Sequence, residues 1–321
     1  MRLPRPFNFA PYHDGPHARP YFEGWYFKQA SEAGAFSVIP GIYLGKDGGT
    51  AFVQVIFGSP PESRFVPYPI EEFRFHPGRF ELSIGKNAFS AEHVTLDIDE
   101  IGLSASLSYT GHVPLVSSPL SPSVMGYFAY LPAMQCNHGV VSLSHQANGT
   151  VEFGGRHLVF RDADGYIEKD WGREFPQSWI WVQANHGDAG LMCAAASIPM
   201  PGFAFTGVIC ALVYGDRQYR FATYNGARLV SLSADGHRVE AELVRRDFRL
   251  YIAAHSDAMG TLMAPSPAGM TRQITESISA VCDVVLEHRG RTLIRSRFNH
   301  AGLEMLHPEG LQVKSLDSNQ R

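Results

Sequence analysis

Two segments of this sequence combine ionisable and aromatic residues at a spacing that could support acid catalysis. In residues 19–28, strand alternation would place Glu23 on one face with Tyr21 and Trp25, and Tyr26 on the other. Aromatic surroundings disfavour an ionised carboxylate, so Glu23 is a candidate general acid. One alternative stays open, in which Glu23 only forms an ion pair with a lysine or arginine across the sheet.

The second segment, residues 166–185, holds three of the four tryptophans together with several ionisable residues. Alternation near its end would group four side chains on one face: Trp179, Trp181, Gln183 and Asn185. The residues between them could pack in a core, while the tryptophan face lines a cavity for an apolar ligand. Exposure of this face at an interaction surface is the alternative.

The elements that must position these side chains are predicted to be strands. The 31 glycines and 21 prolines divide the sequence into short segments with period-two alternation. The clearest predicted strands are 34–43, 51–57, 80–84, 151–160, 178–184, 207–213 and 280–286. Turn signals stand at 46–49, 148–149, 163–165 and 235–236. The pattern predicts meandering antiparallel sheets.

The length of 321 residues is compatible with two domains, which we place at residues 1–160 and 161–321. Proline-rich stretches at 113–124 and 259–271 are expected to be loops at the rim of a cavity. The pattern Gln-x-Asn-His-Gly occurs at 135–139 and again at 183–187, which could mark equivalent strands in two halves.

Composition narrows the classes of partner. A net charge of -4 leaves no basic surplus for phosphates, so nucleic acid is not an expected partner. The 14 histidines and four cysteines show no metal-ligand spacing, so no metal site is expected. The N-terminus has no apolar signal-peptide region, and no apolar run is long enough to span a membrane; a cytoplasmic location is the expectation.

Both chemistry-bearing segments resemble motifs of the tocopherol cyclase family. The family's Phe-Glu-Gly-Trp-Tyr element corresponds to residues 22–26, and its Glu-Lys-x-Trp-Gly element, with the Phe-Pro and Trp-x-Trp-x-Gln that follow, to residues 168–183. Further similar stretches lie at 134–142, 221–226 and 301–304, in consistent order along nearly the whole chain. The resemblance implies an all-β fold of two lipocalin-like antiparallel halves, barrel or sandwich, enclosing an apolar cavity lined by aromatic residues.

The resemblance also implies ring closure on a prenylated hydroquinone, an intramolecular reaction that needs no cofactor. An acid protonates an alkene, aromatic faces stabilise the tertiary cation, and the phenol oxygen captures it. Glu23 or Asp170 would be the acid, and Lys169 would pair with a carboxylate. The residues expected to contact the substrate are Tyr21, Trp25, Tyr26, Lys169, Trp171, Trp179, Trp181, Gln183 and Asn185.

Two further functions compete with this expectation. Capture of the same cation by water would make the protein an isoprenoid hydratase. A lipocalin-like cavity could also serve a non-catalytic carrier of lipid or quinone. In each case the expected partner is a small apolar isoprenoid or prenylated aromatic molecule, and a transient contact with a membrane surface is a further possible interaction.

Overall fold

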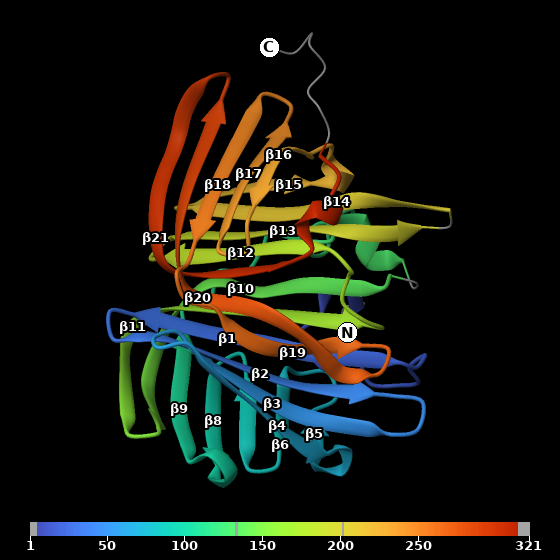
Figure 1. Ribbon diagram of the computed structural model, residues 1–321, viewed down its shortest axis with the longest axis vertical. Helices are drawn as coiled ribbons and strands as arrows, with labels where there is room; N and C mark the ends of the chain where they lie inside the picture. Colours follow the sequence, from blue (N-terminus) through green and yellow to red (C-terminus); the bar gives the residue numbers. More distant parts are fainter. Residues whose placement is uncertain (1–4, 132–133, 201, 314–321) are drawn as a thin grey trace. The chain divides into compact units, whose positions relative to one another are not determined.

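The chain consists almost entirely of antiparallel β-strands joined by turns and short 3-10 helices, which confirms the all-β fold class (Figure 1). The computed structural model describes residues 5–131, 134–200 and 202–313. Within these residues, two compact units form. The first comprises the chain up to Phe175 together with Thr261–Gln273, and the second comprises Pro176–Gly260 and the chain from Ile274 onward.

The first unit is built on an 11-stranded sheet of order β4-β3-β2-β1-β11-β10-β9-β8-β7-β6-β5. Its strands are β1 (Tyr21–Ser31), β2 (Gly34–Leu44), β3 (Gly49–Phe57), β4 (Glu62–Pro69), β5 (Phe73–Phe75), β6 (Glu81–Ile84), β7 (Asn87–Ser90), β8 (His93–Ile98), β9 (Leu103–Thr110), β10 (Cys136–Phe153) and β11 (Arg156–Gly172). Its 3-10 helices are η1 (Arg5–Phe7), η2 (Ile70–Glu72), η3 (Asp99–Ile101) and η4 (Gly126–Tyr130).

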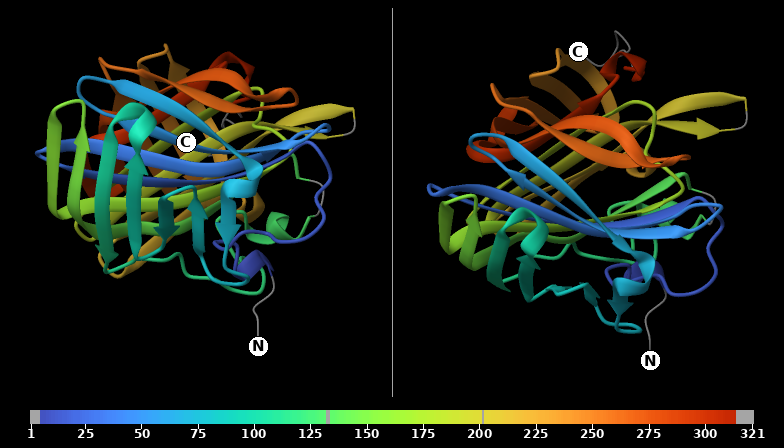
Figure 2. Two further views of the ribbon diagram at one scale, coloured as in Figure 1. Left: turned by 90° about the horizontal axis from the view of Figure 1, so that it is seen from below. Right: turned by 60° about the horizontal axis from the view of Figure 1, so that its bottom comes forward.

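This sheet is curled. Its two edge strands, β4 and β5, follow one another in the sequence and are joined by η2. Side chains of β1–β3, such as Phe27 and Phe57, share one apolar core with Phe89 of β7 and Leu103 of β9. Figure 2 shows the blue strands lying across the cyan and green ones. A sheet closed in this way has the lipocalin-like form that the sequence predicts.

The second unit is built on a 10-stranded sheet of order β15-β14-β13-β12-β21-β20-β18-β17-β16, with β19 paired to β20. Its strands are β12 (Trp179–His186), β13 (Ala189–Met200), β14 (Phe203–Tyr214), β15 (Arg217–Ala222), β16 (Arg228–Ala234), β17 (Arg238–Arg245), β18 (Phe248–His255), β19 (Gly260–Ser266), β20 (Gly269–His288) and β21 (Arg291–Leu306). Its 3-10 helices are η5 (Thr223–Asn225) and η6 (Pro308–Gly310). Ile180, Val182 and Ala184 lie in its core, as alternation predicts.

Several local predictions were wrong for identifiable reasons. The stretch 151–160 is not one strand, because the turn at Gly154 and Gly155 separates β10 from β11. Residues 148–149 and 163–165 are not turns but parts of these two long strands. Gly149 marks an irregularity in the pairing of β10, where a Cβ would lie 1.9 Å from the Ser106 carbonyl oxygen.

The expected rim loop at 259–271 is instead the hairpin formed by β19 and the start of β20. Pro265 is compatible with a strand here because β19 is paired only to β20, and proline is tolerated on such an edge. The residues of this hairpin, Thr261–Gln273, belong to the first unit. The amide of Gln54 pairs with the backbone of Met263, and the hydroxyl of Tyr43 donates to the carbonyl of Pro267.

The boundary placed after residue 160 stays a prediction about domains, and β11 runs through it without interruption. No helix among the described residues is long and apolar enough to cross a membrane.

Candidate functional site

Strand β11 presents ionisable side chains to both faces of the first unit's sheet. It pairs with β1 in a register that sets Trp25 opposite Lys169 and Gly24 opposite Asp170. Because successive side chains alternate, Lys169 shares a face with Glu23 and Trp25, whereas Asp170 lies on the other. The sequence grouped Glu23 and Asp170 as alternative acids of one site, and the structure separates them.

On the face shared with the core, Glu23 and Lys169 form an ion pair, and both side chains are fully buried. Carboxylate oxygen Oε1 of Glu23 also accepts the backbone N–H of His13 at 3.0 Å, and Oε2 accepts the Tyr21 hydroxyl at 2.5 Å. The carboxylate is thus enclosed by donors. This is the cross-sheet ion pair that the sequence left open as the alternative for Glu23.

The same ion pair fixes the position of the segment that precedes β1, residues 9–13. The Lys169 ammonium donates to the carbonyl oxygens of Phe9 and Pro11, both at 2.7 Å, and the Trp25 indole donates to that of Ala10 at 2.7 Å. The ammonium also lies 4.8 Å from the Trp25 ring, within cation–π distance. We infer an anchoring role for Glu23 and Lys169, and a catalytic role for Glu23 stays a prediction.

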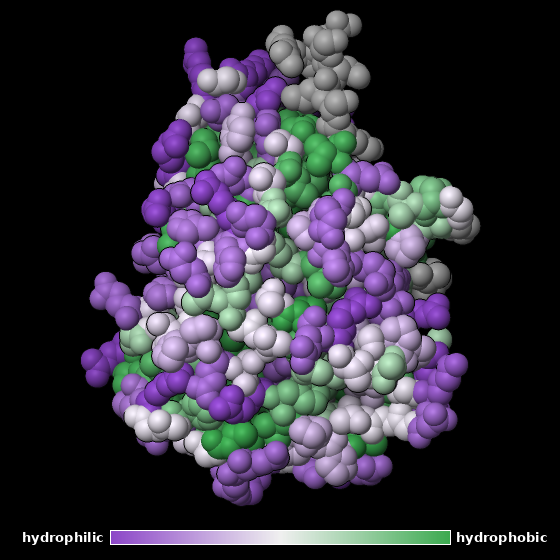
Figure 3. All heavy atoms as spheres, viewed as in Figure 1, coloured by the Kyte–Doolittle hydropathy of each residue, from purple (hydrophilic) through white to green (hydrophobic). Residues whose placement is uncertain are grey.

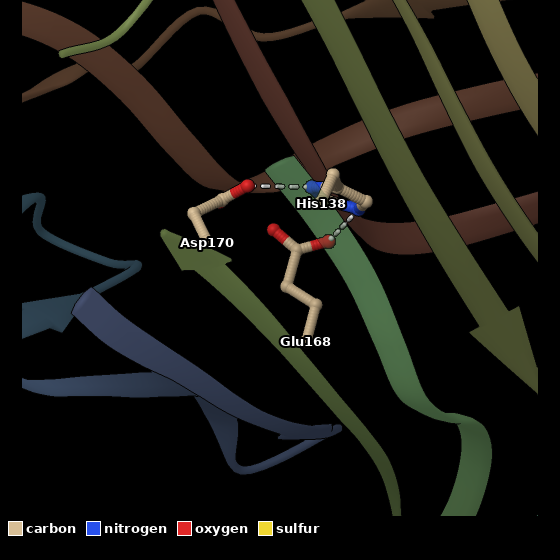
Figure 4. Close-up of side chains that lie close together, drawn as sticks. All are labelled: His138, Glu168 and Asp170. Atoms are coloured by element: carbon tan, nitrogen blue, oxygen red, sulfur yellow. Dashed lines mark hydrogen bonds and ion pairs between the residues drawn. The ribbon is translucent and has the colours of Figure 1, made fainter. Parts of the chain in front are cut away.

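On the opposite face, His138 of β10 lies between two carboxylates of β11 (Figure 4). Its ring nitrogen Nδ1 lies 2.9 Å from Oδ1 of Asp170, and Nε2 lies 3.1 Å from Oε2 of Glu168. The hydroxyl of Tyr166 donates to the same Glu168 oxygen. We call His138, Glu168 and Asp170 the acid cluster. The Glu168 side chain is 6% exposed and that of Asp170 is 22% exposed, so Asp170 is the carboxylate of the acid cluster that a ligand can reach.

The electrostatics of the acid cluster favour a proton held on His138. Burial alone would lower the pKa of His138, but the charges of Glu168 and Asp170 outweigh it and raise that pKa well above its usual value. Burial and the Glu168 charge likewise raise the pKa of the Tyr166 hydroxyl, which stays protonated. A buried imidazolium between two carboxylates can supply a proton to a group that it contacts.

Aromatic rings flank the acid cluster on its own face of the sheet. Tyr26 pairs with Glu168 in the register, and its ring lies 6.4 Å from that of Tyr166 in an edge-on arrangement. The rings of Phe22 and Phe175 pack edge-on at 5.3 Å. Such ring faces can stabilise a developing positive charge. Of the sequence-predicted site residues, the structure brings Asp170 and Tyr26 to this face.

A metal ion is a second chemical possibility for the acid cluster. Single ligand atoms of His138, Glu168 and Asp170 lie within 4.8 Å of one another, and these donor types suit a divalent metal. However, each nitrogen of His138 faces a different carboxylate, whereas one metal ion would take only one nitrogen. This geometry fits a shared proton better, and the expected absence of a metal stays a prediction.

Trp171 pairs with Glu23 in the register and lies 5.3 Å from the Lys169 ammonium, on the face of the anchoring ion pair. The four other predicted residues belong to the second unit. Trp179 and Trp181 lie on the face of β12 opposite the core, where the Trp179 indole donates to Glu304 at 2.7 Å. On the same face, the Gln183 side-chain amide donates to the side-chain oxygen Oδ1 of Asn185 at 2.7 Å. All four are at least nine-tenths buried. Their role in lining a cavity stays a prediction.

The sequence reasoning missed His138, Glu168 and Tyr166 as site residues. Glu168 was part of a recognised motif, and His138 lay in the Gln-x-Asn-His-Gly pattern, yet no spacing linked them. The alternation Tyr166, Glu168, Asp170 was the available signal, because it predicts three polar side chains on one face of a buried strand. Buried polar groups must find partners, so a fourth polar residue was to be expected nearby.

The raised pKa of His138 predicts how the acid cluster affects stability with pH. Because the pKa is raised in the folded state, protonated His138 stabilises fully below its unfolded pKa of about 6.5, and this stabilisation is lost as pH rises through the folded pKa. The loss in unfolding free energy caused by His138→Gln should therefore be largest at pH 6 and smaller at pH 10, measured by urea denaturation. The exposed His157, which pairs with Glu152, provides a control in His157→Gln. A loss for His138→Gln that is the same at every pH would contradict the protonated state.

Comparison with known proteins identifies the family. Residues 114–306, more than half of the chain, match the model of the tocopherol cyclase-like family. The chain belongs to this family, which confirms the resemblance seen in the sequence. It is 23% identical over 286 residues to a rice protein (Oryza sativa subsp. japonica) named "probable tocopherol cyclase, chloroplastic", and this match spans 70% of the chain and 61% of the rice protein. A 63-residue stretch, 20% of the chain and 13% of the relative, is 33% identical to the chloroplastic tocopherol cyclase of Zea mays.

Solved structures share the fold over nearly the whole chain. A Nitrosomonas europaea protein designated AttH aligns with a TM-score of 0.57 at 14% identity, covering 95% of this chain and 97% of its own. CghA, solved with Sch210972, gives 0.59 at 13% identity, covering 89% of each chain. Kievitone hydratase from Nectria haematococca gives 0.52 at 9% identity, covering 88% of each. At these identities the likeness establishes the fold alone.

Proposed function

We propose that the protein is a cofactor-independent enzyme that protonates an alkene of an isoprenoid or prenylated hydroquinone and closes a ring. Membership of the tocopherol cyclase-like family supports this proposal. The observation that carries it is the acid cluster, in which a protonated His138 lies 2.9 Å from the partly exposed Asp170.

In the proposed mechanism, protonated His138 passes its Nδ1 proton to the Asp170 carboxylate, and the Asp170 carboxyl so formed transfers that proton to one alkene carbon, which leaves a tertiary cation on the other. His138 is neutral after this transfer, and the negative charge of the Asp170 carboxylate stabilises the cation. Tyr26 and neighbouring rings face the cation. The phenol oxygen of the substrate then captures the cation, and the phenol proton returns through Asp170 to His138, so that the cluster regains its starting state and the product is an isomer of the substrate.

Trp179, Trp181, Gln183 and Asn185 belong to the second unit, and their contact with the apolar part of the substrate stays a prediction from the sequence. Tryptophan faces bind hydrocarbon, and amides form hydrogen bonds with polar groups of a ligand. The sequence-predicted contacts of Tyr21, Trp25, Lys169 and Trp171 carry less weight, because their face of the sheet belongs to the core and to the N-terminal anchor.

Hydration is the second candidate, and the 22% exposure of Asp170 favours it, since water that reaches the acid could capture the same cation. Incubation with a prenylated hydroquinone followed by mass spectrometry separates the candidates. We expect a product of unchanged mass and altered retention, formed equally after treatment with a chelator. A product heavier by one water would indicate hydration, unchanged substrate that co-purifies with the protein would indicate a carrier, and loss of product with the chelator would indicate a metal.

A further inference from the structure

Strands β13 and β14 extend beyond the rest of their sheet as a two-stranded ribbon. Their neighbour β12 pairs with β13 only up to Ala196, and β15 pairs with β14 only from Ile209 onward. Residues 197–200 and 203–206 are therefore paired with one another, and no other strand in the described part of the chain flanks them (Figure 1). Hydrogen bonds from Gln312 to Thr206 and Ala204 support the base of this ribbon.

The ribbon is apolar where it is most exposed. No charged residue or histidine occurs in the sequence from 189 to 214. Next to the turn, Met200 is 47% exposed and Phe203 is 62% exposed. In Figure 3 the ribbon at the right-hand edge is coloured green to white towards its end. Exposed apolar side chains concentrated on one projection normally mark an interaction site.

The apolar side chains of the ribbon continue along one face to the tryptophans. Partners in the antiparallel register share a face, which groups Met200 with Phe203 and Ile198 with Phe205. Further along the same face, Ala196 pairs with Gly207 of β14 on one side and with Trp179 of β12 on the other. Ala194 of β13 pairs with Trp181 of β12. This apolar strip, defined by these residues, connects the ribbon's tip to the proposed substrate-binding tryptophans within one sheet.

We propose that the tip of the β13–β14 hairpin inserts into a lipid surface and that the apolar strip admits the isoprenoid substrate from that surface. The docking step stands by itself, and the delivery step rests on the proposed function. Apolar chains partition into bilayers rather than water, so an enzyme that acts on them gains from a contact that bridges the two.

Lipid is favoured over a protein partner because the tip is uncharged on both faces. Pro199 and Ala204, which point away from Met200 and Phe203, are also exposed. A protein surface would cover one face of so thin a ribbon and leave the other in water, whereas the interfacial region of a bilayer surrounds it on all sides. Because the ribbon is uncharged, its binding should depend on buried apolar area and be insensitive to salt.

Co-sedimentation of the full chain with phosphatidylcholine vesicles tests the docking step. We expect the wild-type protein to sediment with vesicles equally at low and high salt. The double variant Met200→Ser, Phe203→Ser should bind vesicles about tenfold or more weakly, because it removes most of the apolar area at the tip. Leu293→Ser is the matched control, since Leu293 is 45% exposed elsewhere in the same unit, and should bind as the wild type does.

Three outcomes would overturn the docking step: no binding of the wild type, equal binding of the double variant, or a wild-type dimer that the double variant dissociates in light scattering. The last would assign the tip to a second copy of the chain. Vesicle binding is measured without turnover, so its failure is distinguishable from failure of the proposed reaction. Substrate held in vesicles should react more slowly with the double variant than with Leu293→Ser, and equal rates would overturn the delivery step.

Discussion

Replacement of Asp170 by asparagine is expected to lower the turnover number by about 10²- to 10⁴-fold, the usual contribution of a general acid. Asparagine keeps the size of the side chain and can still accept a hydrogen bond from His138, but it has no carboxyl proton to transfer. Because the alkene makes no strong contact with the acid before proton transfer, the loss should appear in kcat with little change in KM. Product formation from a prenylated hydroquinone, followed by mass spectrometry under saturating substrate, measures it.

Two matched variants make this result specific. Asp97→Asn changes an exposed aspartate of the same unit and should leave turnover unchanged. Glu23→Gln alters the other sequence-predicted acid; if Glu23 only anchors the N-terminal segment, the folded variant should retain most of its turnover. Full activity in Asp170→Asn together with loss of activity in folded Glu23→Gln would reverse the assignment and return the catalytic role to Glu23.

Glu168→Gln should give a different signature, because Glu168 acts through His138. The negative charge of Glu168 is one of the two that raise the pKa of His138, so its removal should lower that pKa. The alkaline limb of the pH–rate profile is then expected to move to lower pH. A uniform loss of activity at every pH would indicate that Glu168 has only a structural role.

Alternation along single strands could be predicted from the sequence with considerable accuracy. It placed Glu23 with Trp25, and Ile180 with the core of the second half, because a strand side chain can point only to one of two faces. The β-rich composition and hairpin turns at 46–49 and 235–236 were also sufficient to predict the fold class. These features depend on neighbouring residues in the chain.

Pairing between distant strands could not be predicted in this way. The closing of β1 onto β11 sets Trp25 opposite Lys169, about half the chain away, and nothing in either segment specifies that register. His138 joins the acid cluster only because β10 pairs with β11 at Asp170. Glycines were ambiguous signals for a related reason. Gly165 lies within β11 and forms no turn; its missing side chain leaves room for the His145 ring, because a Cβ at Gly165 would lie 2.2 Å from His145 Nε2.

Replacement of Lys169 by methionine is expected to lower the free energy of unfolding of the first unit by about 3–5 kcal/mol, the usual cost of breaking a buried ion pair from one side. The variant keeps most of the side-chain volume but leaves the Glu23 carboxylate without its cation in a fully buried position. It also removes the donor that holds the Phe9 and Pro11 carbonyls, so the N-terminal segment should lose protection as well. Hydrogen exchange of peptides covering β1, β11 and residues 8–20 measures both effects.

The size of the effect should depend on the unpaired charge. Combining Lys169→Met with Glu23→Gln removes that charge, and the double variant should recover much of the lost stability, because replacing both partners costs far less than breaking the pair. Lys86→Met provides the surface comparison: Lys86 pairs with Asp97 and Asp99 but is 62% exposed, so its loss should cost far less than the loss of Lys169. If Lys169→Met and Lys86→Met cost the same, the buried pair is not what anchors the N-terminal segment, and the assignment of Glu23 to structure loses its main support.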